Sequence, residues 1–209
     1  MFKWIESPQI RSAIKAIHSV GADGNCGFRS VSYDVYNDQC KWDQVKEDML
    51  ETYMKYKDTL YKVIGSDAVT QFEEERMVNR LLSRKSPCLE RDDQATWFST
   101  FICPQVVADT YNRPVIVFSY IENRSNTGKL INTYEACVYF PLINMELIAA
   151  NNPISILAAQ SHFYYIEFTR TPKGRMKKFP YPSINIDHHR LRNEYPTICS
   201  HTDYSVLYY

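Results

Sequence analysis

Two apolar segments near residue 160 are joined by only two residues. "PISILAA" ends at Ala159 and "HFYYIEF" begins at His162, which leaves "QS" as the whole connection. A two-residue connection suits a β-hairpin, whereas parallel strands need a crossover of about a dozen residues or more. The sequence therefore predicts an antiparallel pair of strands here, with His162 at the start of the second strand.

Other segments of the chain show helical or strand patterns. Apolar residues spaced at three and four predict helices over residues 7–18, 26–37, 43–64 and 67–85, the first with Ser7 as N-cap and Pro8 at its first position. A helical stretch through Val106 and Tyr111 leads into the β-branched run "PVIVFSY", and "TYEACVYF" predicts a further strand. We expect helices before residue 112 and mainly strands from there to residue 170.

The length and composition favour one folded domain. The chain has 209 residues and 44% hydrophobic content, and we place the domain at residues 1–170, followed by a Pro- and Tyr-rich extension at 171–209. Twenty-four basic and 24 acidic side chains cancel, which gives no reason to expect nucleic acid as a partner. No segment has the length of a membrane-spanning helix, so we expect no membrane partner either.

The six cysteines indicate a reducing compartment. They include no CxxC pair and form no even framework of the kind that small secreted domains use. We expect a cytoplasmic or nuclear protein. The adjacent pair His188 and His189 has no Cys or carboxylate at metal-ligand spacing, so we predict no metal site.

The segment "DGNCGFR", residues 23–29, is the strongest candidate for chemistry. It places Cys26 at the start of a predicted helix, where unpaired N–H groups and the helix dipole favour a thiolate and so lower the thiol pKa. Gly24 and Gly27 allow the surrounding N–H groups to converge beside the sulfur. The alternative is a turn that contains a small buried cysteine.

A cysteine nucleophile needs a base, which is commonly a histidine far along the chain. Of the five histidines, His18 falls on the polar side of the first predicted helix, and three lie in the extension. His162 is the candidate base because it opens a predicted strand, where the sheet holds it at an edge. The alternative is a structural histidine at the start of a strand.

Taken together, these segments resemble the ovarian tumour (OTU) family of cysteine proteases. "DGNCGFR" is similar to the family's Asp-Gly-Asn-Cys loop, "SHFYYI" to its histidine strand, and "ATWFSTFICPQVVADTYNRPVIVFS" to the segment between them. The resemblance covers about residues 10–168, and residues 40–90 align least well. It implies an α/β domain of the α+β type, a papain-like OTU domain with a small, mostly antiparallel sheet between helices.

The resemblance also implies an activity: removal of ubiquitin or polyubiquitin from proteins by a thiol mechanism that needs no cofactor. Cys26 would be the nucleophile, His162 the general base and Asp23 the motif aspartate that is grouped with them. N–H groups around Gly24 and Asn25 would form the oxyanion hole. Trp97 would line the substrate groove, or it would simply pack in the core.

Two positions depart from the family pattern. Tyr164 stands where many members have an Asp or Asn that orients the histidine, which leaves Asp23, Asn151 or Asn152 as candidates for that role. Strand alternation places Glu167 on the face opposite His162. Gly27 occupies a position where a bulkier apolar residue is common.

Three functions follow from these features. The first is a deubiquitinating peptidase, which we expect to be a monomer, acting on ubiquitin or another ubiquitin-like modifier. The second is a weak or inactive OTU-like module that binds ubiquitin, for which Tyr164 is the only support. The third is an unrelated cysteine hydrolase or amidotransferase that acts on a small molecule.

Overall fold

In the computed structural model, the residues that can be described are 2–62, 76–83, 96–124, 130–144, 152–170 and 183–184. Strands and helices alternate irregularly along the chain. The elements are η1 (Phe2–Trp4), α1 (Pro8–Ala13), β1 (Ile14–Ser19), α2 (Cys26–Tyr36), η2 (Gln39–Lys41), α3 (Trp42–Tyr56), η3 (Lys57–Tyr61), α6 (Cys103–Tyr111), β2 (Val115–Arg124), β3 (Leu130–Tyr139), β4 (Ile154–Ala159), β5 (His162–Phe168) and β6 (Ser183–Ile184). Residues 76–82 are also helical, within the helix expected from the sequence over 67–85.

The strands form one mixed sheet in the order β1-β5-β4-β2-β3-β6. The pairs β1–β5, β5–β4 and β2–β3 are antiparallel, whereas β4–β2 and β3–β6 are parallel. The predicted hairpin is confirmed: Ala159 pairs with His162 across a turn in which Gln160 and Ser161 have φ angles of 54° and 58°. Both turn residues are left-handed, as a type I′ hairpin turn requires.

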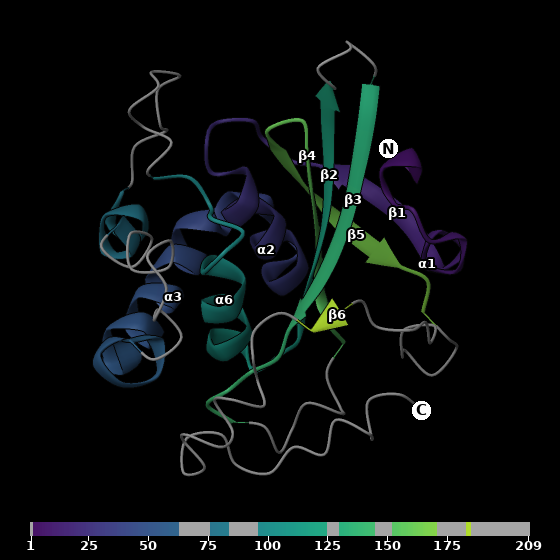
Figure 1. The fold of residues 1–209 in the computed structure, drawn as a ribbon. Coiled ribbons are helices and arrows are strands. Elements are labelled where there is room, and N and C mark those ends of the chain that lie inside the picture. Colours follow the sequence, from purple (N-terminus) through teal and green to yellow (C-terminus); the bar gives the residue numbers. More distant parts are fainter. Residues whose placement is uncertain are drawn as a thin grey trace.

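Helices cover one face of the sheet and the N-terminal segment covers the other (Figure 1). Alternate residues of β2 point to opposite faces: Val115 and Val117 join the core with α2, α3 and α6, while Ile116 and Phe118 join a second core with Trp4 and the other N-terminal residues. The fold class expected from the sequence is therefore observed, with the sheet between two unequal layers.

The prediction of one helix over residues 7–18 is wrong in its second half. Ser7 does cap α1, accepting a hydrogen bond from the Ile10 N–H at 3.3 Å, and Pro8 is the first helical residue. The helix ends at Ala13, and Ile14–Ser19 form β1, which pairs with β5. Ile10, Ile14 and Ile17 are spaced as on a helix, but pairing with a strand about 150 residues away fixes the conformation of β1.

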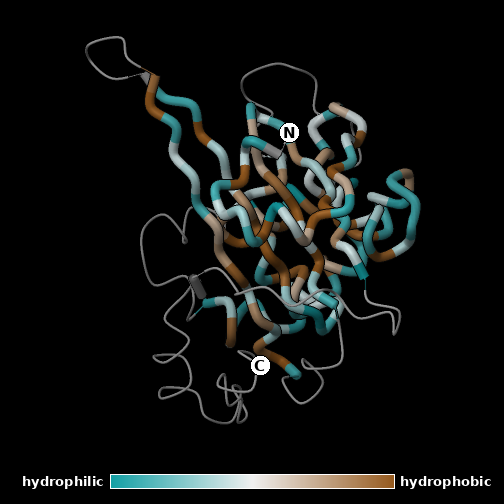
Figure 2. The backbone as a smooth tube through the Cα atoms, turned by 90° about the vertical axis from the view of Figure 1, so that its right-hand side faces the viewer, coloured by the Kyte–Doolittle hydropathy of each residue, from teal (hydrophilic) through white to brown (hydrophobic). Residues whose placement is uncertain are grey.

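Two features extend from this core. Residues 121–124 of β2 continue beyond the end of β4, and among the described strands they pair with β3 alone, so the β2–β3 hairpin projects from the body of the domain, as Figure 2 also shows. Strand β6 adds two residues of the C-terminal extension to the edge of the sheet beside Cys137 and Val138. Among the described helices, none combines the length and apolar character needed to cross a bilayer.

A buried carboxylate joins the helical layer to the end of β3. Asp109 of α6 accepts hydrogen bonds from the backbone N–H of Leu142 at 2.6 Å, the Tyr61 hydroxyl at 3.0 Å and the Gln105 side-chain amide at 3.1 Å. Burial raises the pKa of Asp109 to about 6 against the lowering effect of these donors. This group makes the stability of the fold sensitive to pH.

Candidate active site

The loop before α2 presents Cys26 at the first residue of that helix. Gly24 has a φ of 78°, a left-handed conformation that glycine adopts without a steric penalty. Asn25 is the N-cap residue and is fully buried, although its side chain makes no capping hydrogen bond. Cys26 itself is 7% exposed, so the candidate nucleophile lies just beneath the surface.

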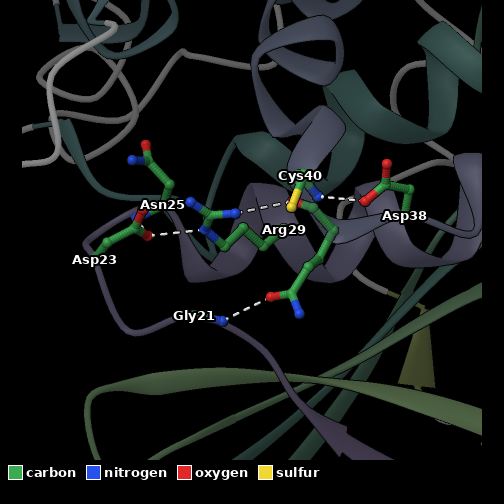
Figure 3. A network of polar contacts seen from close by, with 7 residues as sticks. Gly21, Asp23, Asn25, Arg29, Asp38 and Cys40 are labelled. Carbon is green, nitrogen blue, oxygen red and sulfur yellow. Dashed lines mark hydrogen bonds and ion pairs between the residues drawn. The ribbon is translucent and has the colours of Figure 1, made fainter.

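An ion pair within the motif holds this loop in shape (Figure 3). The Asp23 carboxylate accepts from Arg29 Nε at 3.0 Å, from Arg29 Nη2 at 2.6 Å and from the Asn25 backbone N–H at 3.1 Å. Arg29 Nη1 donates to the Gln39 carbonyl at 3.1 Å, and the Gln39 side chain accepts from the Gly21 N–H at 2.8 Å. The loop is therefore tied to α2 and η2 at both of its ends.

These contacts define what Asp23 does in the structure. Partial burial acts to raise its pKa, but the hydrogen bonds from Arg29 and the Asn25 backbone outweigh burial and hold the pKa below its ordinary value. Both carboxylate oxygens are engaged by Arg29. Asp23 thus stabilises the loop through its ion pair with Arg29, and its participation in catalysis stays a prediction.

The electrostatic environment of Cys26 differs from the sequence-based expectation. Burial raises the pKa of the thiol above its ordinary value, even though the backbone N–H groups of Phe163 and Gly27 act to lower it. The negative charge of Asp23 adds to the increase. The prediction of a lowered pKa is therefore wrong, because the thiolate loses more hydration on burial than the nearby donors return.

Phe163 also links Cys26 to β5, because both residues belong to the same core cluster and Phe163 is the second residue of that strand. The adjacent residue, His162, has a lowered pKa because burial disfavours the imidazolium, and a hydrogen bond to the Val20 backbone offsets this only partly. Its Nε2 atom is buried and makes no hydrogen bond to any residue that the structure describes. The candidate base is thus a neutral imidazole next to Phe163, which shares a core cluster with Cys26.

Tyr164 packs directly against the His162 ring. The two ring centroids are 4.7 Å apart and the ring planes are nearly perpendicular, at 82°. Burial, and then the proximity of Cys26, raise the pKa of the Tyr164 hydroxyl. The residue that departs from the family pattern therefore lies in the site, in contact with the candidate base.

The other candidates for orienting His162 have different partners or lie outside the described residues. Glu167 accepts from Lys15 Nζ at 2.7 Å and lies 3.0 Å from His18 Nε2. The Asn152 backbone carbonyl accepts from Arg113 Nε at 2.7 Å, a role of its side-chain amide at His162 stays a prediction, and Asn151 is outside the described residues. The expected separation of Glu167 from His162 agrees with these contacts.

Phe98 packs beside the candidate active site, a position that was not predicted from the sequence. Its ring meets Phe28 at 5.2 Å and Phe163 at 5.3 Å, both edge to face. A Cβ atom at Gly27 would lie 2.3 Å from the Phe98 Cβ atom, which explains why this chain has glycine there. Trp97 is half-buried next to Phe98, and its role in the groove stays a prediction.

The predicted oxyanion donors are only partly available. The Asn25 backbone N–H is used by Asp23, so it does not serve as a free donor in this conformation. The Asn25 carboxamide is turned away from the Asp23–Arg29 pair (Figure 3), and neither its oxygen nor its nitrogen has a hydrogen-bond partner among the described residues. A fully buried amide without partners is costly and uncommon in native structures, and a catalytic role is one explanation for such a group.

Sequence reasoning missed Arg29, Phe98 and Trp4, whose indole lies 5.3 Å from the Tyr164 ring. Arg29 had a usable signal, because an acid and an arginine flank the cysteine within one short motif. Trp4 and Phe98 had none, because ordinary core packing predicts the same residue types at those positions.

Comparisons with known proteins identify the fold. No protein-family model and no curated protein matched the chain. The viral OTU domain protease from Qalyub virus is 17% identical, with a TM-score of 0.50 over 76% of this chain and 87% of that one. The viral OTU domain protease from Taggert virus is 16% identical, with a TM-score of 0.49 over 81% and 88%. The Hazara virus OTU solved with ubiquitin is 13% identical, with a TM-score of 0.45 over 75% and 82%.

The resemblance noted in the motifs is thus confirmed at the level of the fold. The match that carries this conclusion is the OTU domain protease from Qalyub virus, whose TM-score is 0.50 over 76% of the chain. The mixed sheet, the helix that begins at the cysteine and the strand that begins at the histidine occur here in one α+β arrangement. This chain has the fold of the OTU domain proteases.

Proposed function

We propose that the chain is a thiol-dependent deubiquitinase that hydrolyses isopeptide bonds after the C-terminal glycine of ubiquitin. The observation that carries this proposal is the position of Cys26, which packs in the same core cluster as Phe163 of β5, where the Phe163 backbone N–H acts to lower the thiol pKa. Next to that N–H is His162, whose buried Nε2 has no hydrogen-bond partner among the described residues. A nucleophile and a base from distant parts of the chain therefore share one site in an OTU fold.

The pKa directions imply a neutral pair before substrate binds. Burial raises the pKa of Cys26 and lowers the pKa of His162, so thiol and imidazole are both uncharged near neutral pH. In the acylation step, Nε2 takes the thiol proton and the sulfur attacks the carbonyl carbon of the terminal glycine. The tetrahedral intermediate then collapses, the carbon–nitrogen bond breaks, and His162 protonates the leaving lysine amine.

Deacylation reverses the roles with water as the second nucleophile. Nε2 takes a proton from water, the resulting hydroxide adds to the thioester, and the carbon–sulfur bond breaks to give ubiquitin with a free carboxyl group. His162 returns the proton to the Cys26 sulfur. Because the Asn25 N–H is engaged, we assign the oxyanion donors to the Cys26 N–H and the unpartnered Asn25 carboxamide.

The test is reaction with ubiquitin that carries an electrophile at its C-terminus. We expect the wild type to form one covalent adduct, Cys26→Ala to form none, and His162→Ala to react at least about 100-fold more slowly. Cys40→Ser is the matched control, because Cys40 is the exposed cysteine of the described part of the chain and should not react in a site-directed way. An adduct that persists in Cys26→Ala and disappears in Cys40→Ser would contradict the proposal.

A second candidate is a module that binds ubiquitin without cleaving it. It is favoured by the raised pKa of Cys26 and by Tyr164 at the position where an acid or amide is common in the family. The two candidates differ in one measurement: a binding module would perturb the NMR spectrum of ubiquitin at micromolar concentration while releasing no product from di-ubiquitin and forming no adduct with the electrophile.

A further inference from the structure

The base of the proposed mechanism has no carboxylate partner among the residues that the structure describes. Asp23 is bound to Arg29, and Glu167 is bound to Lys15 and His18. An imidazole must nevertheless hold one ring plane and one tautomer to accept a proton at a fixed atom. Something else must therefore position His162.

The side chain of Tyr164 is placed to fix the plane of the His162 ring. At 4.7 Å between centroids and 82° between planes, the edge of one ring meets the face of the other, which is a favourable arrangement for aromatic rings. Rotation of the imidazole about its bond to the backbone would break this contact. A flat side chain in this position thus restricts the imidazole without any charge.

Tyr164 is itself held from both sides. In the sheet it pairs with Ser19 of β1 and with Leu157 of β4, so its backbone is fixed by two neighbouring strands. Its ring contacts Trp4 at 5.3 Å, and Trp4 is 7% exposed and stacks on Tyr120 at 6.1 Å. The N-terminal segment thereby supports a residue of the active site.

The Val20 backbone supplies the remaining constraint. It acts to raise the pKa of the His162 ring, and because Nε2 has no hydrogen-bond partner among the described residues, this backbone group favours the neutral tautomer protonated at Nδ1. A proton held on Nδ1 leaves the lone pair of Nε2 free to receive the thiol proton. A backbone carbonyl and an aromatic contact together can do what an acid does elsewhere, namely fix the tautomer and the plane.

We propose that Tyr164, supported by Trp4, is the positioning residue of His162 and replaces the acid or amide of a catalytic triad. The expected effect on catalysis rests on the proposed function, whereas the contact between the Tyr164 and His162 rings does not. Its distinctive feature is that the tyrosine acts through its ring. The hydroxyl group is not required.

The kinetic test compares two substitutions at Tyr164 on a ubiquitin substrate. Tyr164→Phe keeps the ring, and we expect kcat within about 3-fold of the wild type, whereas Tyr164→Leu should lower kcat by about 10- to 100-fold with KM within about 2-fold. Trp4→Leu should lower kcat by a smaller factor. Tyr134→Leu is the matched control, because Tyr134 packs on Tyr120, one contact further from the site, and kcat should be unchanged.

The second readout does not depend on activity. In protein labelled with ¹⁵N-histidine, we expect the His162 ring of the wild type and of Tyr164→Phe to show one neutral tautomer protonated at Nδ1. Tyr164→Leu should show averaged ring signals, with Tyr164→Met taking its place if the leucine variant does not fold. His162→Gln assigns the signal among the five histidines.

The outcomes separate the two proposals. If the wild type cleaves no ubiquitin substrate but Tyr164→Leu randomises the tautomer, the positioning role stands and the proposed function fails. If the wild type is active while Tyr164→Leu retains both kcat and the tautomer, the positioning role is overturned. A loss of kcat in Tyr164→Phe equal to that in Tyr164→Leu would also overturn it, because the hydroxyl would then be the acting group.

Discussion

Replacement of Gly27 by alanine tests how tightly the active site is packed. A Cβ atom at this position would lie 2.3 Å from Phe98 Cβ, 2.4 Å from Phe98 Cγ and 3.0 Å from Phe98 Cδ1. The position of Cβ is fixed by the backbone, so no change of rotamer at Phe98 relieves the first contact. The backbone around residue 98 or the start of α2 has to move.

The expected cost follows from this geometry. Overpacking of a well-packed core costs about 1 to 3 kcal/mol, and a shift of backbone places this case near the upper end. Alanine recovers up to about 1 kcal/mol through its better helix propensity. The net loss of unfolding free energy is about 2 kcal/mol, which for a chain of this size lowers Tm by about 4 to 8 °C.

Thermal unfolding monitored by circular dichroism measures this loss, and the rate of Cys26 labelling measures its effect on the site. We expect slower labelling, because Phe98 also packs on Phe163, beside the sulfur. Gly21→Ala is the control: its Cβ would meet only the flexible Arg29 side chain, at 3.2 Å, so the loss should be below about 1 kcal/mol. A Gly27→Ala variant as stable as the wild type would refute the packing argument.

Three further predictions concern charge. Arg29→Gln should release Asp23 and loosen the loop, so that labelling of Cys26 by the ubiquitin electrophile slows by at least about 10-fold while the fold persists by circular dichroism. Because burial raises the pKa of Cys26, its alkylation by iodoacetamide should keep accelerating above pH 9, and a plateau reached near pH 7 would contradict this. The folded-state pKa of Asp109, about 6, exceeds its unfolded value of 3.8, so its stabilising effect is full below that value and is lost as pH rises through 6. Between pH 7 and pH 4 the wild type should therefore gain about 2 kcal/mol relative to Asp109→Asn in urea unfolding.

Local sequence signals were sufficient for the elements around the nucleophile and the base. The cysteine helix was predicted over residues 26–37 and is observed as Cys26–Tyr36, ending at Asn37 with a left-handed φ of 53°. The hairpin around Gln160 and Ser161 was predicted from its two-residue connection. In both cases the signal lies within a few residues of the structure that it specifies.

Strand β1 is an element that local sequence signals did not predict. Ile14 and Ile17 continue the apolar spacing of α1, and the chain nevertheless changes from helix to strand at Ile14. The deciding interaction is the ladder with β5, in which Ile14 pairs with Phe168 and His18 with Tyr165. A periodicity argument contains no information about a partner that lies 150 residues away.

The candidate site likewise has features that the sequence predicted and features that it did not. The candidate nucleophile and the candidate base could be selected from the sequence, because a cysteine at a helix N-terminus and a histidine at the start of a strand are marked by their immediate neighbours. The protonation states and partners of these residues depend on the tertiary structure. Burial raises the pKa of the Cys26 thiol, Arg29 forms an ion pair with Asp23, and the Tyr164 ring packs against the His162 imidazole. Desolvation and contacts across the sheet depend on segments that meet only after folding, and for that reason no local pattern could reveal them.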